Sequence, residues 1–218
     1  VSMTVPMGRA ADEPALLLQP YQVLEVLPML ARLDTLAKAR GVRVFPGNDI
    51  GYFGPYEAQL RGNNRGGYRG TCAAGREADR AIKGCPSLPS RDYVGGSIRD
   101  ASLQEIWERA APLQFTRNRT KASLWGFCAD CYYAEACMGG CSWTAHTLFG
   151  KLGNNPYCHH RALELLYQGM RERIVQVARP EGRPFDTGRF NCIVEPWPEE
   201  ELPQARALAE SGIGYLER

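Results

Sequence analysis

Cysteines constrain this chain more than any other feature of its sequence. Seven of the eight cysteines fall between residues 72 and 158. They are Cys72, Cys85, Cys128, Cys131, Cys137, Cys141 and Cys158. Cys128 and Cys131 form a Cys-x2-Cys pair, the usual first half of a site that gathers four sulfurs around a metal or cluster. Gly139 and Gly140 lie within the same run and let the backbone approach inorganic sulfide without a Cβ clash, which favours an iron–sulfur cluster over a single ion.

Two other interpretations of these cysteines stay open. Buried cysteines can serve simply as small hydrophobic residues, which suits one or two of them better than seven. Structural zinc is the stronger alternative, because four thiolates in two pairs suit Zn²⁺ equally well. Seven ligands fit two closed zinc sites awkwardly, however, and the sequence does not place the eighth cysteine, Cys192, near the others. We therefore predict iron–sulfur binding.

Charge and hydropathy argue against several classes of partner. The formal net charge of +2 comes from 26 basic and 24 acidic side chains scattered along the chain, so no basic stripe suits a phosphate backbone. The longest apolar stretch, residues 15–18, is too short to span a bilayer, and the N-terminus lacks the pattern of a signal peptide. We expect a cytoplasmic protein with no nucleic-acid and no membrane partner. Thiols stay reduced in that compartment, so clustered cysteines indicate ligands before disulfides.

The first 50 residues predict a strand, a helix and a second strand. Residues 1–7 resemble the inside of a buried strand, and because no initiating Met precedes them we expect a fragment of a longer protein. Pro20 suits a first helical position, and apolar spacing from Val23 onward predicts a helix that ends near Gly41. Residues 42–45 predict a short strand. This order predicts a βαβ unit of a parallel sheet.

The rest of the chain predicts less regular structure. Residues 51–70 have neither helical nor strand period and predict a long connection. A helix over residues 102–110 is predicted by the capping box that begins at Ser102. A second helix is predicted over about 160–179, because apolar residues recur on one helical face and Pro180 follows. A strand over 190–194 and a short C-terminal helix complete the chain.

The order and spacing of the cysteines resemble the seven-cysteine pattern of the SPASM domain. That domain is the C-terminal part of radical S-adenosylmethionine enzymes that modify peptides and proteins. The run Cys-x2-Cys-x5-Cys-Met-Gly-Gly-Cys and the helix before it carry the resemblance, strongly over residues 72–158 and more weakly over 3–45. It implies an α/β fold class, with the end of a partial (β/α) barrel followed by an irregular α+β SPASM iron–sulfur domain. The expected parts are the barrel end at 1–50, a linker at 51–70, the SPASM domain with its following helix at 71–179, and an extension at 180–218.

The resemblance also implies two auxiliary [4Fe–4S] clusters. One would be held completely by Cys128, Cys131, Cys137 and Cys158. The other would be held by Cys72, Cys85 and Cys141 and would lack one protein ligand. Its fourth iron would be open to a substrate group, or bound by Cys192 or an oxygen ligand. Two departures from the family pattern affect this incomplete set, because Arg80 replaces a usual hairpin glycine and the spacing from Cys72 to Cys85 is short.

The chain contains no Cys-x3-Cys-x2-Cys triad, which radical S-adenosylmethionine chemistry requires. We therefore expect no catalytic residues and no activity in this chain alone. The resemblance implies that the full-length enzyme also holds S-adenosylmethionine and a third [4Fe–4S] cluster. Its expected partners are a peptide or protein substrate and an electron donor such as a flavodoxin or ferredoxin. The alternative is a non-catalytic iron–sulfur protein for electron transfer or partner binding.

Several other residues have a possible role at a site. Arg9 follows the first predicted strand, where active-site loops of parallel barrels converge, so it is a candidate contact to S-adenosylmethionine or substrate, against the simpler interpretation of a solvated arginine. The same positional argument applies to Asn48 and Asp49. His159 and His160 follow Cys158, and we expect helix-start residues there before metal ligands. The aromatic residues expected to shield clusters from water are Trp125, Tyr132, Tyr133 and Trp143.

Overall fold

The computed structural model of the chain describes residues 13–47, 49–62, 75–76, 81–183 and 185–214. The helices are α1 Val23–Lys38, α2 Glu57–Arg61, α3 Ser90–Tyr93, α4 Leu103–Arg109, α5 Gln114–Arg117, α6 Ala134–Cys137, α7 Ser142–Phe149, α8 His159–Tyr167 and α9 Leu202–Gly214. The strands are β1 Gly75–Arg76, β2 Ala81–Lys83, β3 Val94–Ser97, β4 Met170–Ala178 and β5 Arg189–Pro196. The predicted strand over residues 1–7 lies outside the described ranges.

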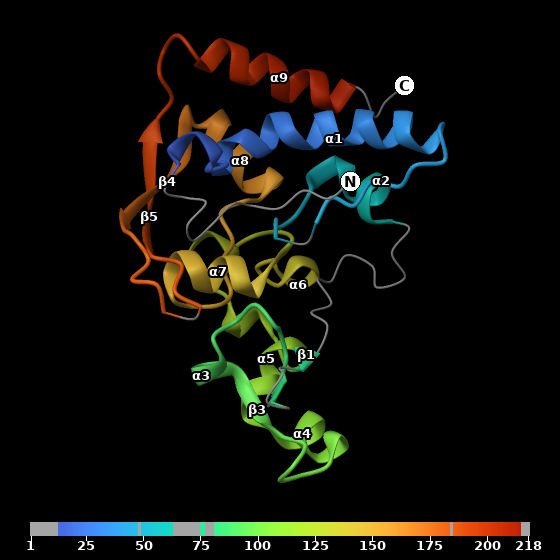
Figure 1. The fold of residues 1–218 in the computed structure, drawn as a ribbon. Coiled ribbons are helices and arrows are strands. Elements are labelled where there is room, and N and C mark those ends of the chain that lie inside the picture. Colours follow the sequence, from blue (N-terminus) through green and yellow to red (C-terminus); the bar gives the residue numbers. More distant parts are fainter. Residues whose placement is uncertain (1–12, 48, 63–74, 77–80, 184, 215–218) are drawn as a thin grey trace.

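Helices and sheets occupy three tiers (Figure 1). At one end α1, α8 and α9 contact one another. The middle tier contains α6 and α7, and a small lobe at the other end contains α3, α4, α5 and the three-stranded sheet (Figure 1). The hairpin of β4 and β5 runs along one side of the molecule and contacts both α7 and α8. The fold is therefore mixed α and β, with small sheets.

The N-terminal helix is confirmed. Helix α1 follows a 3-10 turn that begins at Pro20, and its buried face includes Val23 and Leu27. Pro28 lies inside it, where a proline removes one backbone donor. Gly41 ends the following turn with a φ of +70°, a conformation that glycine adopts without a Cβ penalty.

The strand predicted over residues 42–45 is wrong. Residues 42–44 have no regular structure, and Phe45 forms only an isolated bridge. Val42 and Phe45 are each 48% exposed, so neither lies in the interior of a sheet. All strand pairs in the described part of the chain are antiparallel, so the predicted parallel βαβ unit is not found there. The predicted connection over 51–70 also differs, because it contains α2.

The helix predicted over 160–179 is wrong beyond Tyr167. Gly169 ends α8 with a φ of +71°, and its N–H donates to Leu166 O at 2.9 Å. The chain then continues as β4, in which Glu172 and Ile174 are buried. The apolar residues follow a helical spacing across Gly169. After this glycine, however, alternate residues are buried, as in a strand. The predicted strand over 190–194 is confirmed as part of β5.

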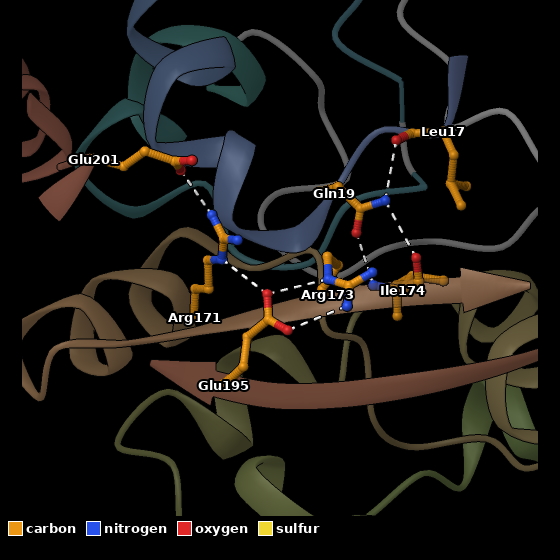
Figure 2. A network of polar contacts seen from close by, with 7 residues as sticks. All are labelled: Leu17, Gln19, Arg171, Arg173, Ile174, Glu195 and Glu201. Atoms are coloured by element: carbon orange, nitrogen blue, oxygen red, sulfur yellow. Dashed lines mark hydrogen bonds and ion pairs between the residues drawn. The ribbon is translucent and has the colours of Figure 1, made fainter. Parts of the chain in front are cut away.

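The hairpin of β4 and β5 is fastened to the N-terminal segment by polar contacts (Figure 2). The Gln19 side chain accepts from Ile174 N–H at 2.7 Å and donates to Ile174 O at 3.2 Å. Glu195 accepts from both Arg171 and Arg173, and Arg171 also donates to the carboxylate of Glu201 just before α9 (Figure 2). The Arg173 hydrogen bond lowers the pKa of Glu195. These contacts join the segments just before α1 and α9 to the hairpin.

Two apolar cores hold the described residues together. The larger core takes residues from the predicted barrel end, linker, SPASM and extension segments alike. Its members include Leu27, Phe53, Tyr157, Leu166, Ile174 and Phe190. The smaller core belongs to the lobe and has Ile82, Ile106 and Leu113 as its buried members. Burial of apolar area drives folding, so the larger core provides most of the stability.

The predicted capping box of the small lobe is confirmed. Ser102 Oγ accepts from Glu105 N–H at 3.2 Å, and Ser102 N–H donates to Glu105 Oε2 at 3.1 Å. Helix α4 begins directly after this cap. Of the helices in the described ranges, none combines the length and apolar character needed to cross a membrane.

Candidate metal centre

Four cysteines line one small cavity between α6 and α8. They are Cys128, Cys131, Cys137 and Cys158. Three come from the closely spaced run, and the fourth immediately precedes α8. These are the residues that the SPASM resemblance assigned to the complete set. The chain therefore brings the distant Cys158 to the same cavity as the local run.

The first two cysteines lie on a tight loop. Cys128 ends a 3-10 turn whose first residue, Gly126, has a φ of +55°. The N–H of Tyr133 donates to Cys131 Sγ at 3.3 Å. Backbone donors of this kind stabilise a thiolate or a sulfur that is bound to metal. The loop thus places both cysteines at the cavity and supplies a hydrogen bond to the sulfur of Cys131.

Three successive left-handed residues follow Cys137. Met138, Gly139 and Gly140 have φ values of 52°, 72° and 66°. A Cβ on Gly139 would lie 2.7 Å from the carbonyl carbon of Gly153, so only glycine fits between these two backbone segments. Arg119 fastens this turn, because it donates to Met138 O at 2.8 Å. The glycines therefore bring the cysteine run against neighbouring backbone.

Cys158 is held by the larger core and by a short backbone pairing. Gly51 N–H donates to Tyr157 O at 2.6 Å, and His159 N–H donates to Tyr52 O at 2.9 Å. Burial raises the pKa of the Cys158 thiol to about 12. Its position at the N-terminus of α8 favours negative charge on the sulfur, which offsets part of the cost of burial.

A buried polar chain adjoins the cavity. The Cys128 thiol lies 3.6 Å from Asn154 Oδ1, and the same oxygen accepts from the guanidinium of Arg161. Arg161 also donates to Glu172, and both side chains are at most 9% exposed. Burial raises the pKa of Cys128, whereas the charge of Arg161 acts in the opposite direction. A buried cation thus lies next to a site that would carry several thiolates.

Aromatic rings close the cavity. Phe127, Tyr133 and Tyr52 line it, and the rings of Tyr52 and Tyr133 lie 4.1 Å apart. Of the four aromatic residues expected to shield a cluster, only Tyr133 lines this cavity. Tyr132 is 88% exposed, and Trp125 packs edge-on against the Phe149 ring.

The two histidines lie beside the cavity without lining it. His159 is buried against the ring of Tyr56, and burial lowers its pKa to about 4. His160 contacts the rings of Tyr133 and Phe127. Both are the first residues of α8, as expected from the sequence. Their ring contacts give them a packing role.

The incomplete cysteine set is only partly described. Cys72, Arg9 and Arg80 lie outside the described residues. Cys141 immediately precedes α7, and burial raises its pKa. Cys85 follows β2 in a turn that the buried Lys83 holds through donation to Pro86 O and Leu88 O. Neither Cys85 nor Cys141 lines the four-cysteine cavity.

Cys192 lies on β5, away from the four-cysteine cavity. Its thiol is 3.5 Å from Glu172 Oε1, and burial raises its pKa to about 12. The seven cysteines with described positions are free thiols. Among the described residues, no three Cys, His, Asp or Glu side chains are arranged to hold a single metal ion.

Four residues of the site escaped the sequence analysis. They are Tyr52, Arg119, Asn154 and Arg161. Tyr52 belongs to a segment interpreted as a linker. The only signal was Asn154-Asn155-Pro156, a turn-forming run just before Cys158. Asn155 donates to Asp49 O at 2.9 Å, so the Asp49 backbone supports the site, while Asn48 lies outside the described residues.

Comparison with known proteins adds no further constraint. No protein family, curated protein or solved structure matches the sequence significantly.

Proposed function

We propose that Cys128, Cys131, Cys137 and Cys158 hold one [4Fe–4S] cluster. We further propose that the chain is the auxiliary-cluster part of a radical S-adenosylmethionine enzyme that modifies a peptide or protein. The observation that carries the proposal is the convergence of four cysteines on one cavity, including one that lies far from the others in sequence.

The residues around the cavity suit such a group. Four cysteines are the usual ligand set for a [4Fe–4S] cluster. Gly139 permits close backbone approach, and the rings of Phe127 and Tyr52 line the cavity, where they would shield a bound cluster from water. A bound cluster supplies reversible one-electron transfer. The chain's own contribution is to orient the sulfurs, exclude water and place the Arg161 charge beside Cys128.

The remaining parts of the proposal follow from the family resemblance. Cys72, Cys85 and Cys141 would hold a second auxiliary cluster with one ligand position left for another group. The full-length enzyme would add S-adenosylmethionine and a third cluster, and a flavodoxin or ferredoxin would donate electrons. Thiols that bind a cluster have to stay reduced, so we propose a reducing compartment such as the cytoplasm.

Metal analysis tests the cluster proposal directly. The chain is purified without oxygen and assayed for iron, sulfide and zinc. We expect about eight irons with matching sulfide and the absorbance of [4Fe–4S] clusters. Cys158→Ser should remove about four irons, whereas the matched variant Cys192→Ser should retain the four irons of the four-cysteine cavity. Zinc near two per chain without sulfide would overturn the proposal in favour of a structural zinc module.

The enzymatic part has a separate test. The natural reading frame upstream of residue 1 should encode a Cys-x3-Cys-x2-Cys triad. A protein joined to that segment should cleave S-adenosylmethionine to 5′-deoxyadenosine when it is reduced. If iron binds but the triad is lacking, the chain is an iron–sulfur protein without radical chemistry.

A further inference from the structure

The two outer edges of the β4–β5 hairpin differ. On the β4 edge, the Gln19 side chain bonds to both the N–H and the C=O of Ile174, as a neighbouring strand would (Figure 2). Strand edges expose unpaired backbone groups, and proteins commonly cover them. The outer edge of β4 is therefore covered by the side-chain amide of Gln19.

The register shows which groups face the opposite edge. Trp197 N–H donates to Gly169 O at 2.9 Å, so residues 169 and 197 form a hydrogen-bonded pair. Such pairs alternate with pairs whose backbone groups point away from each other. Ile174 pairs with Cys192 and points outward to Gln19. The backbone groups of Cys192, and likewise of Phe190 and Val194, therefore point away from β4.

In the described residues, no side chain bonds to the outward-facing backbone groups of β5 in the way that Gln19 bonds to Ile174. Within the described ranges, no backbone or side-chain group bonds to the N–H or C=O of Phe190, Cys192 or Val194. Beside this edge lies an open cleft of about 1280 Å³, bordered by α7 through His146 and Phe149 and by β5 from Arg189 to Ile193. The cleft gives an added strand room.

We propose that the outer edge of β5 binds an extended peptide segment as a third, antiparallel strand. Alternating outward donors and acceptors at residues 190, 192 and 194 match the backbone of an extended chain. The Phe190 side chain belongs to the larger core, and the partly buried Cys192 side chain packs against that core. Peptide residues that pair with them therefore direct their side chains to the same face, toward Phe149 of α7.

The charges along the cleft favour an acidic peptide. Three arginines border it, against two carboxylates; these residues are Arg91, Arg183, Arg189, Asp92 and Asp186. Asp92 pairs with Arg91, and Arg183 pairs with Glu181 at 3.3 Å. Asp186 accepts backbone N–H groups from Glu181 and Gly188, so the acidic preference rests on Arg189. Arg189 is exposed at the start of β5. The occupant that fits is a strand with apolar side chains toward α7 and acidic side chains outward.

This inference rests on the proposed function for its biological role, since it provides a place for the peptide that such an enzyme modifies. Its physical basis is separate, because the edge groups belong to β5 and not to the cysteine cavity. Peptide binding and iron content can therefore be measured independently. If the peptide does not bind, the cluster proposal is unaffected, and the absence of iron would likewise leave the peptide-binding inference unaffected.

The test uses a fluorescent alternating Glu-Val peptide of about eight residues. Fluorescence anisotropy measures its binding to the whole chain. In the proposed pairing the valine amides face β5 and the glutamate amides face away. We expect N-methylation of the valines to abolish binding and N-methylation of the glutamates to leave it unchanged. A Lys-Val peptide should bind more weakly, because the exposed Arg189 lies at the start of the strand that it would pair with.

A variant of the protein tests the same edge. Val194→Pro removes one outward N–H and leaves the bonds between β4 and β5 intact. It should weaken binding roughly three- to tenfold, as expected for one lost hydrogen bond, while Val194→Thr should not. Circular dichroism and iron content check that the variant is folded.

Equal binding of both N-methylated peptides, or no binding by the unmodified peptide, would overturn the proposal. So would a dimer in sedimentation that Val194→Pro dissociates, because a second copy would then occupy the edge.

Discussion

The two cysteine sets differ in how the fold supports them. The four-cysteine cavity is built from a short loop run and from the start of α8, which packs in the larger core. In the other set, Cys85 belongs to the small lobe and Cys141 immediately precedes α7, while Cys72 lies outside the described residues. One set is thus assembled around a single cavity, and the other draws on two parts of the molecule.

This difference teaches where each site is vulnerable. The four-cysteine cavity depends on backbone turns and on a helix with many buried neighbours. The incomplete set depends on the placement of a lobe whose core has three buried residues, Ile82, Ile106 and Leu113. Small cores contribute little stability because they bury little apolar area. We expect damage to the lobe to affect the incomplete set first.

The largest expected effect comes from removing a ligand. Cys158→Ser should eliminate the cluster of the four-cysteine cavity, whereas Cys85→Ser should affect only the other cluster. Each variant should lose about four irons. Their electron paramagnetic resonance spectra after reduction should then be complementary, and together they should account for the spectrum of the unaltered chain. If Cys85→Ser also removed all iron, the two sets would not be independent.

Truncating one residue in each core sharpens the same comparison. Leu166→Ala truncates a fully buried side chain of α8, and Ile106→Ala truncates a buried side chain of the lobe that is 4% exposed. Each should lower the free energy of unfolding by about 2–5 kcal/mol for the unit that contains it. Thermal unfolding and iron retention measure the outcome. We expect Leu166→Ala to release iron from both sets, and Ile106→Ala to release it from the incomplete set alone. If Ile106→Ala released iron from both sets and Leu166→Ala released it from the incomplete set alone, the larger core would not be the support of the four-cysteine cavity.

A smaller effect is expected from crowding in the cysteine run. Gly139→Ala places a Cβ 2.7 Å from the Gly153 backbone at a φ of +72°. It should cost about 2–4 kcal/mol, from left-handed strain plus overpacking. Gly150→Ala is the matched control, because its φ is +64° but no atom lies within 4 Å of the new Cβ. It should cost about 1–2 kcal/mol. Equal losses in urea unfolding would show that close backbone approach is unimportant.

The sequence predicted local features well when the signal was local. The capping box at Ser102, the glycine that ends the turn after α1 and the strand over 190–194 all depend on neighbouring residues. The helix predicted over 160–179 failed because the apolar positions of α8 and β4 happen to share a helical period across Gly169. A positive φ at that glycine outweighed the pattern.

Features of the site that depend on distant packing escaped prediction. Spacing alone could not choose between Cys141 and Cys158 as the partner of the local run, and the family resemblance provided that grouping. The pairing of Gly51 and Tyr52 with the segment around Cys158 is a contact between distant residues. The ion pair between Arg161 and Glu172 was hidden because the sequence placed both on one helix, whereas the structure places them on α8 and β4.

The smallest effect is expected at the cap of α4, which tests whether the lobe is as weakly supported as its core indicates. Ser102→Ala removes the oxygen that accepts from Glu105 N–H, and such a loss costs about 1 kcal/mol. Ser102→Thr keeps the hydroxyl and is the matched control. Hydrogen exchange should speed up in residues 94–117 for the alanine variant, with little change around Cys158. If exchange increased equally at α8, the two cores would unfold as one unit, and the contrast between the two cysteine sets would then reflect ligand number alone.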